Sequence, residues 1–116
     1  MNQPATIHAE ELYQRIRSGE ECIIIDVRTP EEYQALHAEG ALLLTLDECD
    51  ADALTQLLAD QGYSRNSALF LICHSGRRAS AAAQALSAAF PSATVIQGGT
   101  LGWAQAGLPV KPGPQP

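Results

Sequence analysis

Apolar and polar residues are arranged along the chain with two periods, one typical of helices and one typical of buried strands. Leu12 and Ile16 lie four residues apart within residues 9–17, which predicts a helix that ends before Gly19. Residues 22–27 (CIIIDV) form a short apolar run rich in β-branched side chains, which is typical of a strand covered on both faces. The chain therefore opens with a predicted helix and a strand of a parallel sheet.

The same alternation continues through the rest of the chain. Residues 29–32 (TPEE) combine an N-cap threonine, a proline at the first helical position and a glutamate three residues after the cap, which predicts the start of a short helix. Further strands are predicted at residues 41–46, 68–73 and 93–96, and further helices at residues 50–62, at residues 77–90 and around Trp103.

Strands that alternate with helices in one small domain predict an α/β layered fold with right-handed crossover connections. We expect a central, mainly parallel sheet of about five strands, flanked by helices on both faces. In such sheets ligands bind beyond the carboxyl ends of the strands. Cys73 ends one predicted strand and Asp26 lies at the end of another, so both are candidates for a site at this edge.

The length of 116 residues suits one core and is too short for two. We place the domain at residues 1–108 and predict that residues 109–116, rich in proline and glycine, form a flexible tail that extends or frays away from the core. The chain has three cysteines without a CxxC pair, which argues against a disulfide framework or a structural metal site and favours a reduced compartment.

The net charge of −6 argues against nucleic acid or an anionic membrane as a partner, because both require a basic face. The sequence contains no run of some twenty apolar residues, and its first residues lack the pattern of a signal peptide. We therefore expect a soluble cytoplasmic protein without membrane contact. Arg77 and Arg78 form a local cationic island on this acidic chain.

Residues 73–80 (CHSGRRAS) follow a predicted buried strand directly. Loop amides, a helix start and two arginines would surround Cys73, and such surroundings lower the pKa of a thiol and create a reactive thiolate. The alternative is that Cys73 is a small buried core residue. The whole combination within one short span favours a catalytic nucleophile. Substrate binding is assigned to the rest of the loop: His74, Ser75, Gly76, Arg77 and Arg78.

The stretch CHSGRRAS resembles the active-site loop of single-domain rhodanese-like sulfurtransferases. Three further segments resemble other parts of that family in the same order along the chain: residues 24–33 (IIDVRTPEEY), 37–42 (HAEGAL) and 95–110 (VIQGGTLGWAQAGLPV). The resemblance spans nearly the whole chain and implies the rhodanese-like form of the α/β fold.

The resemblance also implies a two-step reaction. The Cys73 thiolate would take the outer sulfur of thiosulfate or another sulfane sulfur donor and hold it as a persulfide. Cyanide or a thiol would then remove the sulfur, and a thioredoxin-like protein or glutathione is a candidate thiol. Arg78, which matches the family's arginine, would orient the small anionic donor. No metal and no organic cofactor is implied.

Asp26 and Arg28 match the family's first motif and are assigned a supporting role, for which we favour a structural ion pair or loop brace over catalysis. His37 is interpreted as a hydrogen-bonding residue of a turn. The role of His74 stays open, because this side chain could tune the thiol or simply face solvent.

The remaining cysteines and the last helix are interpreted as structural. Cys22 opens a predicted buried strand and should be inert, while Cys49 lies in the acidic stretch DECD, where carboxylates would raise its pKa. Gly99 and Trp103 are interpreted as turn and core residues.

Two other functions remain open at this point. One is a non-catalytic or sulfur-carrying regulatory module, fused to or docked on a partner protein. The other is a cysteine phosphatase, a group that shares this fold and places its arginine six residues after the cysteine. Here that position holds Ala79, and Arg78 lies five residues along, so the loop is one residue too short.

Overall fold

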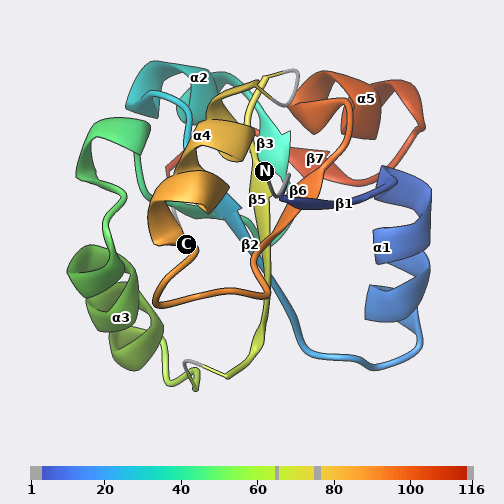
Figure 1. Ribbon diagram of the computed structural model, residues 1–116. Helices are drawn as coiled ribbons and strands as arrows, with labels where there is room; N and C mark the ends of the chain where they lie inside the picture. The colour runs from blue at the N-terminus through green and yellow to red at the C-terminus, as the bar shows by residue number, and fades with distance from the viewer. Residues whose placement is uncertain (1–3, 65, 75–76, 115–116) are drawn as a thin grey trace.

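The computed structural model describes residues 4–64, 66–74 and 77–114 as a central sheet with helices on both sides (Figure 1). The strands are β1 (Ala5–Ile7), β2 (Cys22–Asp26), β3 (His37–Ala38), β4 (Leu42–Leu43), β5 (Ala68–Ile72), β6 (Thr94–Ile96) and β7 (Val110–Lys111). The helices are α1 (Ala9–Arg17), α2 (Pro30–Ala35), α3 (Ala51–Asp60), α4 (Arg77–Leu86), α5 (Gly99–Gln105) and the 3-10 turn η1 (Leu46–Glu48).

The central sheet has five strands in the order β1-β6-β5-β2-β4, and every neighbouring pair is parallel. A separate two-stranded sheet joins β3 and β7 in antiparallel orientation. The α-helices contain between six and ten residues, and none in the described part of the chain is long and apolar enough to cross a membrane.

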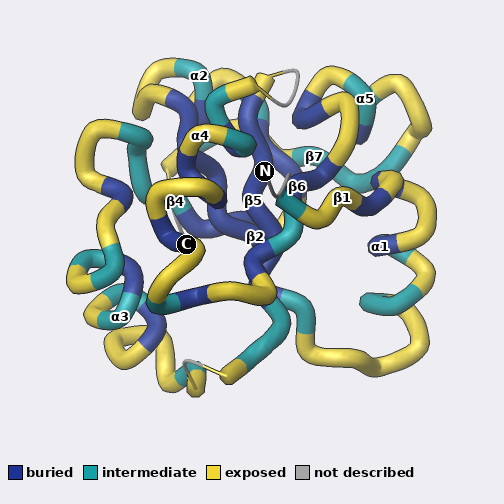
Figure 2. The backbone as a smooth tube through the Cα atoms, viewed as in Figure 1, coloured by how far each residue is buried: buried dark blue, intermediate teal, exposed yellow. Residues whose placement is uncertain are grey.

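The core lies in two layers, one on each face of the sheet. Along β2, Ile23 and Ile25 point into a cluster with α3 and α4, whereas Ile24 points into a cluster with α1, α2 and α5. This alternation follows from the two-residue period of a strand. Figure 2 shows the resulting pattern, in which buried central strands are surrounded by helices with exposed outer faces. The predicted α/β sheet of about five strands with helices on both faces is confirmed.

The predicted strand at residues 41–46 is only partly correct. Regular pairing with β2 covers Leu42 and Leu43 alone, and the chain turns into η1 at Leu46. Leu44 and Leu46 still pack against the core after leaving the strand. Their apolar character therefore reflects burial in an irregular segment, which a sequence pattern cannot distinguish from burial in a strand.

The segment after residue 108 does not simply leave the core, so that part of the prediction is wrong. Val110 and Lys111 pair with β3, and the carbonyl of Pro109 accepts a hydrogen bond from the buried Trp103 indole at 2.7 Å. Backbone pairing outweighs the turn-forming composition here, because β3 presents an open edge to the segment. The boundary at residue 108 and the flexibility of the tail stay predictions.

Candidate active site

Cys73 lies at the carboxyl edge of the central sheet, directly after β5. Within the sheet, Ile72 pairs with Asp26, and the amide of Val27 donates a hydrogen bond to the Ile72 carbonyl at 3.0 Å. The segments that follow β2 and β5 therefore begin side by side. Cys73 and Asp26 lie at the same edge, as the strand pattern predicted.

The side chain of Cys73 faces the start of α4. Cys73 is 1% exposed, and its Sγ accepts a hydrogen bond from the backbone amide of Ala79 at 3.3 Å. Ala79 is the third residue of α4, which begins at Arg77. Amides in the first turn of a helix carry partial positive charge and favour an anionic atom in front of them. The predicted helix start beside the thiol is therefore present.

The rest of the loop is described only in part. His74 and Arg77 are exposed, and the predicted binding residues Ser75 and Gly76 lie outside the described residues. The assignment of this loop to substrate binding stays a prediction.

Arg78 forms a two-pronged ion pair with Glu32. Its Nη1 lies 2.7 Å from Oε1 of Glu32 and its Nη2 lies 2.9 Å from Oε2, and both side chains are about one third exposed. The guanidinium, assisted by hydrogen bonds from Thr29, lowers the pKa of Glu32 to about 2. The hydrogen bonds to Glu32 in turn raise the pKa of Arg78. The arginine predicted to orient the donor thus already binds a carboxylate of the chain itself.

Sequence reasoning missed this role of Glu32. The same carboxylate completes the capping box of α2, where Oε1 accepts hydrogen bonds from the amide and the hydroxyl of Thr29 at 3.1 and 3.2 Å. The capping pattern explains why a glutamate stands at this position. A capping pattern alone contains no signal that the residue also reaches an arginine 46 positions away.

Asp26 and Arg28 form the predicted structural pair. The two side chains are 0% and 6% exposed, and Arg28 donates from Nη2 to Asp26 Oδ2 at 2.8 Å and from Nε to Oδ1 at 3.0 Å. Arg28 also donates to the carbonyl of Leu36 at 2.7 Å, which ties the loop after β2 to the end of α2. The pair therefore acts as a brace, while its supporting role in a reaction stays a prediction.

His37 also behaves as interpreted from the sequence. Its Nδ1 lies 2.8 Å from the carbonyl oxygen of Tyr33, and its ring stacks on the Tyr33 ring with centroids 3.8 Å apart. Both residues are buried, so His37 fixes the turn between α2 and β3.

Gly99 holds the start of α5 against the cysteine loop. The carbonyl of Cys73 accepts a hydrogen bond from Thr100 at 2.7 Å, and that of His74 accepts one from Leu101 at 3.2 Å. Gly99 has φ +58°, and a Cβ there would lie 2.2 Å from the Cys73 carbonyl oxygen. Only glycine permits this approach. Gly99 is therefore more than the turn residue predicted from the sequence.

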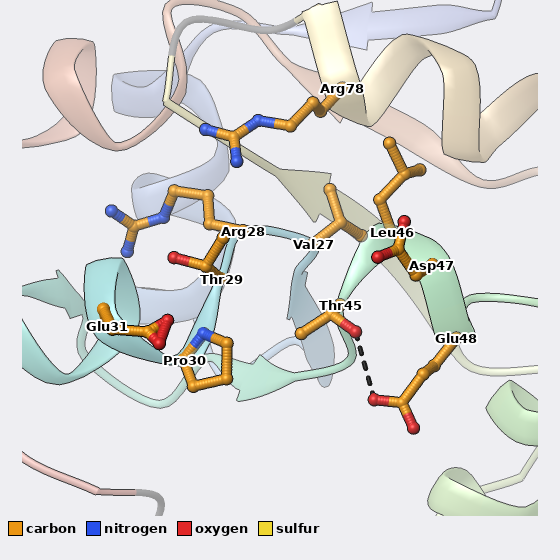
Figure 3. A pocket seen from close by; sticks show the side chains of 10 residues that line it. All are labelled: Val27, Arg28, Thr29, Pro30, Glu31, Thr45, Leu46, Asp47, Glu48 and Arg78. Atoms are coloured by element: carbon orange, nitrogen blue, oxygen red, sulfur yellow. Dashed lines mark hydrogen bonds between the residues drawn. The ribbon is translucent and has the colours of Figure 1, made fainter.

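Two cavities adjoin this edge of the sheet. The first, drawn in Figure 3, has a volume of about 330 Å³ and is lined by Val27, Arg28, Thr29, Pro30, Glu31, Thr45, Leu46, Asp47, Glu48 and Arg78. The second has a volume of about 370 Å³ and is lined by Arg28, Glu32, Ala35, Leu36, His74, Thr100, Leu101 and Ala104. Arg28 lines both, so the cavities lie close to one another beside the cysteine loop.

The other two cysteines are not among the residues that line these cavities. Burial, with a smaller contribution from Asp50, raises the pKa of Cys49 to about 11. The predicted direction is correct, but burial outweighs the neighbouring carboxylates as its cause. Cys22 is partly exposed rather than buried, because it occupies the first position of β2, and partial burial raises its pKa.

Residues 8–106 match a family model described as "Rhodanese-like domain". Two relatives are each 34% identical to this chain: the "Putative sulfur carrier protein YrkF" of Bacillus subtilis over 69% of the chain, and the "Probable adenylyltransferase/sulfurtransferase MoeZ" of Mycobacterium tuberculosis over 87%. The aligned parts span 40% and 25% of the lengths of these relatives, so each relative is much longer than the shared region.

Solved structures share the fold. A thiosulfate sulfurtransferase from Pseudomonas aeruginosa superposes with a TM-score of 0.80 at 22% identity, covering 97% of this chain and 21% of that protein. The rhodanese-like domain of the Alr3790 protein from Anabaena sp. superposes with a TM-score of 0.76 at 23% identity, covering 97% of this chain and 80% of that domain. At these identities the structural similarity concerns the fold alone.

Proposed function

The chain belongs to the rhodanese-like domain family, and we propose that it is a sulfurtransferase that works through a persulfide on Cys73. The family and the printed names of the two relatives support sulfur transfer in general. The identity of the nucleophile, the donor and the acceptor are our proposals.

The proposed reaction has two displacement steps. The Cys73 thiolate attacks the outer sulfur of thiosulfate or another sulfane sulfur donor, a new S–S bond forms, and the old S–S bond breaks as sulfite or a thiolate leaves with the electron pair. In the second step, cyanide or an acceptor thiolate attacks the terminal sulfur and releases the Cys73 thiolate. The chain is neither oxidised nor reduced overall, so the reaction needs no redox cofactor.

The observation that carries the proposal is the contact between Sγ of Cys73 and the first turn of α4. The Ala79 amide lies 3.3 Å from Sγ and would stabilise negative charge on the sulfur before attack and after release. The backbone bonds from Thr100 and Leu101 fix the carbonyls of Cys73 and His74, which holds the nucleophile in place. A fixed sulfur in front of a helix N-terminus suits nucleophilic catalysis.

A sulfur carrier is the second candidate function, because one relative is named as such and both relatives are longer than the matched region. A carrier would form the same Cys73 persulfide but would pass it to a docked partner rather than to a small acceptor such as cyanide, glutathione or a thioredoxin-like thiol. Turnover with small acceptors separates the two functions. We propose the cytoplasm as the place of either function.

The geometry does not favour a phosphatase. The position six residues after Cys73 is Ala79, which is fully buried on the inner face of α4 and carries no charge. A cation at this position, which a phosphatase of this fold would need, would have to be buried in an apolar layer at a large cost.

Intact-mass measurement after incubation with a sulfane sulfur donor tests the proposal. We expect the parent chain to gain one sulfur atom that a thiol removes, and to form thiocyanate when cyanide is supplied. Cys73→Ser should lose both properties and keep the folded far-UV and near-UV circular dichroism of the parent, because serine is similar in size. Cys49→Ser is the matched control and should keep both. Retention of the added sulfur in Cys73→Ser would refute the assignment.

A further inference from the structure

The cleft in Figure 3 adjoins the reactive loop. Arg78 lines this cleft, and the next residue, Ala79, donates to Sγ of Cys73. The opposite wall comes from the segments that follow β2 and β4, which end at the same edge of the sheet as β5. The charges on these walls therefore act on any donor that approaches the thiol from this side.

The two arginines of the cleft are both neutralised by carboxylates of the chain. Arg28 is paired with the buried Asp26. Glu32 binds both terminal nitrogens of Arg78, Nη1 and Nη2, which together form the Arg78 fork. Glu32 stays ionised at all ordinary pH values, because its pKa is lowered to about 2 by the hydrogen bonds from Arg78. A small dianion would have to displace this internal carboxylate to use the Arg78 fork.

Three further carboxylates of the cleft have no such partner. Glu31, Asp47 and Glu48 are exposed, and none of them forms an ion pair with another described residue. Glu48 accepts a neutral hydrogen bond from the Thr45 hydroxyl at 3.1 Å. Figure 3 shows Glu31 on one side of the cleft and Asp47 and Glu48 on the other, all of them below the Arg78 guanidinium. The walls therefore carry an excess of negative charge next to the loop.

We propose that this site selects persulfide donors that carry an ammonium group and discriminates against thiosulfate. The inference refines the donor class of the proposed sulfurtransferase and rests on that function. An ammonium group would interact favourably with the carboxylates of the cleft, whereas a small dianion would be repelled by them and would find the Arg78 fork occupied. Amino-acid and peptide persulfides with a free amino group have this chemistry.

The step itself is the first displacement of the proposed reaction. The Cys73 thiolate attacks the outer sulfur of the donor R–S–SH, the S–S bond of the donor breaks, and R–S⁻ leaves with the electron pair. Cys73 retains the outer sulfur with its proton as the persulfide. Charge and atoms balance, and no further reactant is needed.

Two matched donors isolate the ammonium group. Cysteine persulfide carries it, and N-acetylcysteine persulfide lacks it. The two leaving thiols also differ in pKa, but this difference is the same for every variant, so a change in the ratio of loading rates between variants reports the ammonium group. The rate constant for loading Cys73 is measured by intact mass for the parent, for Asp47→Asn/Glu48→Gln, and for the control Glu10→Gln/Glu11→Gln. The control removes the same charge from exposed positions on α1, which packs with α5 on the other face of the sheet from η1, and neither Glu10 nor Glu11 lines the cleft.

We expect the parent to load cysteine persulfide about 5–10-fold faster than the N-acetyl donor. The Asp47→Asn/Glu48→Gln variant should lower this ratio of loading rates to about 2 or less, whereas the Glu10→Gln/Glu11→Gln control should keep the ratio of the parent. High salt should also reduce the ratio in the parent, because salt screens the carboxylates. Glu32→Gln should raise loading from thiosulfate by about 5-fold or more, because it frees the Arg78 fork.

A ratio that is the same in the parent and the cleft variant would overturn the inference, as would thiosulfate loading that does not rise in Glu32→Gln. In both cases the sulfur still reaches Cys73, so the proposed function survives. If no donor loads the parent, the proposed function fails and the inference fails with it.

Discussion

Replacing Glu32 with glutamine should destabilise the folded chain by removing one ion pair while leaving the helix cap in place. Glutamine also serves at the third position of a capping box, so the hydrogen bonds with Thr29 can be kept. The charge opposite Arg78 is lost, and the fork of Arg78 then faces a neutral amide. The variant therefore isolates the contribution of the pair that links α2 to α4.

The size of the effect follows from the pKa of Glu32. A change from 4.5 to about 2 corresponds to an upper limit of about 3 kcal/mol in the free energy of unfolding. Both side chains are about one third exposed, so water and salt screen the pair. We expect Glu32→Gln to lower the free energy of unfolding by about 1–2 kcal/mol near neutral pH.

The pH dependence provides a second test. The pKa of Glu32 is lower in the folded chain than the ordinary value of 4.5, so its stabilisation is fully present above about pH 4.5 and is lost as the pH falls towards 2. Urea unfolding of the parent and the variant should therefore differ most near neutral pH, and the difference should shrink steadily below pH 4.5.

Glu31→Gln is the control, because Glu31 lies in the same first turn of α2, is exposed and has no ion pair among the described residues. It reports the loss of a charge near the helix dipole alone. If Glu32→Gln costs no more than Glu31→Gln, or if its cost stays constant down to about pH 3, the ion pair does not stabilise the fold as argued.

Two further predictions concern the loop and its sulfur. Gly99→Ala should lower the free energy of unfolding, measured in urea, by about 3 kcal/mol or more, because the new Cβ would lie 2.2 Å from a backbone oxygen. Gly107→Ala is the control, with φ +76° and open space around the new Cβ, and should cost only about 1 kcal/mol. Equal costs would contradict the argument from the close approach of Gly99. Iodoacetamide near neutral pH should label Cys73 before Cys49. Both thiols are buried (1% and 7% exposed), but the Cys73 sulfur accepts a hydrogen bond from the first turn of α4, which favours the thiolate. Peptide mapping that finds Cys49 labelled faster would refute this expectation.

The sequence was sufficient to predict the features that depend on local patterns. The apolar runs located β2 and β5, and the spacing of Leu12 and Ile16 located α1 with its observed bounds. Cys73 stood out because a thiol, a glycine and a helix start follow a buried strand within a few residues. These signals are short-range, so one sequence contains them in full.

The features that depend on packing between distant segments were not predictable in the same way. The short strands β3 and β7 follow α2 and α5, are far apart in sequence and pair with each other, and neither has a pattern of its own. The close approach of Gly99 to the Cys73 carbonyl likewise depends on how α5 sits on the sheet edge. A glycine in sequence shows where the backbone can bend, but not which atoms it must approach.

The Arg78–Glu32 pair shows how such a contact changes a functional interpretation. The loop alone suggested an arginine available to an anionic donor, and that suggestion treated the loop as isolated. The parallel order of β2 and β5 places the start of α2 beside the start of α4, so a glutamate needed for a helix cap also reaches the guanidinium. Because one carboxylate serves both purposes, a change in the first turn of α2 alters the charge offered to a donor beside Cys73. Donor preference in this chain should therefore respond to residues of α2 as well as to those of the cysteine loop.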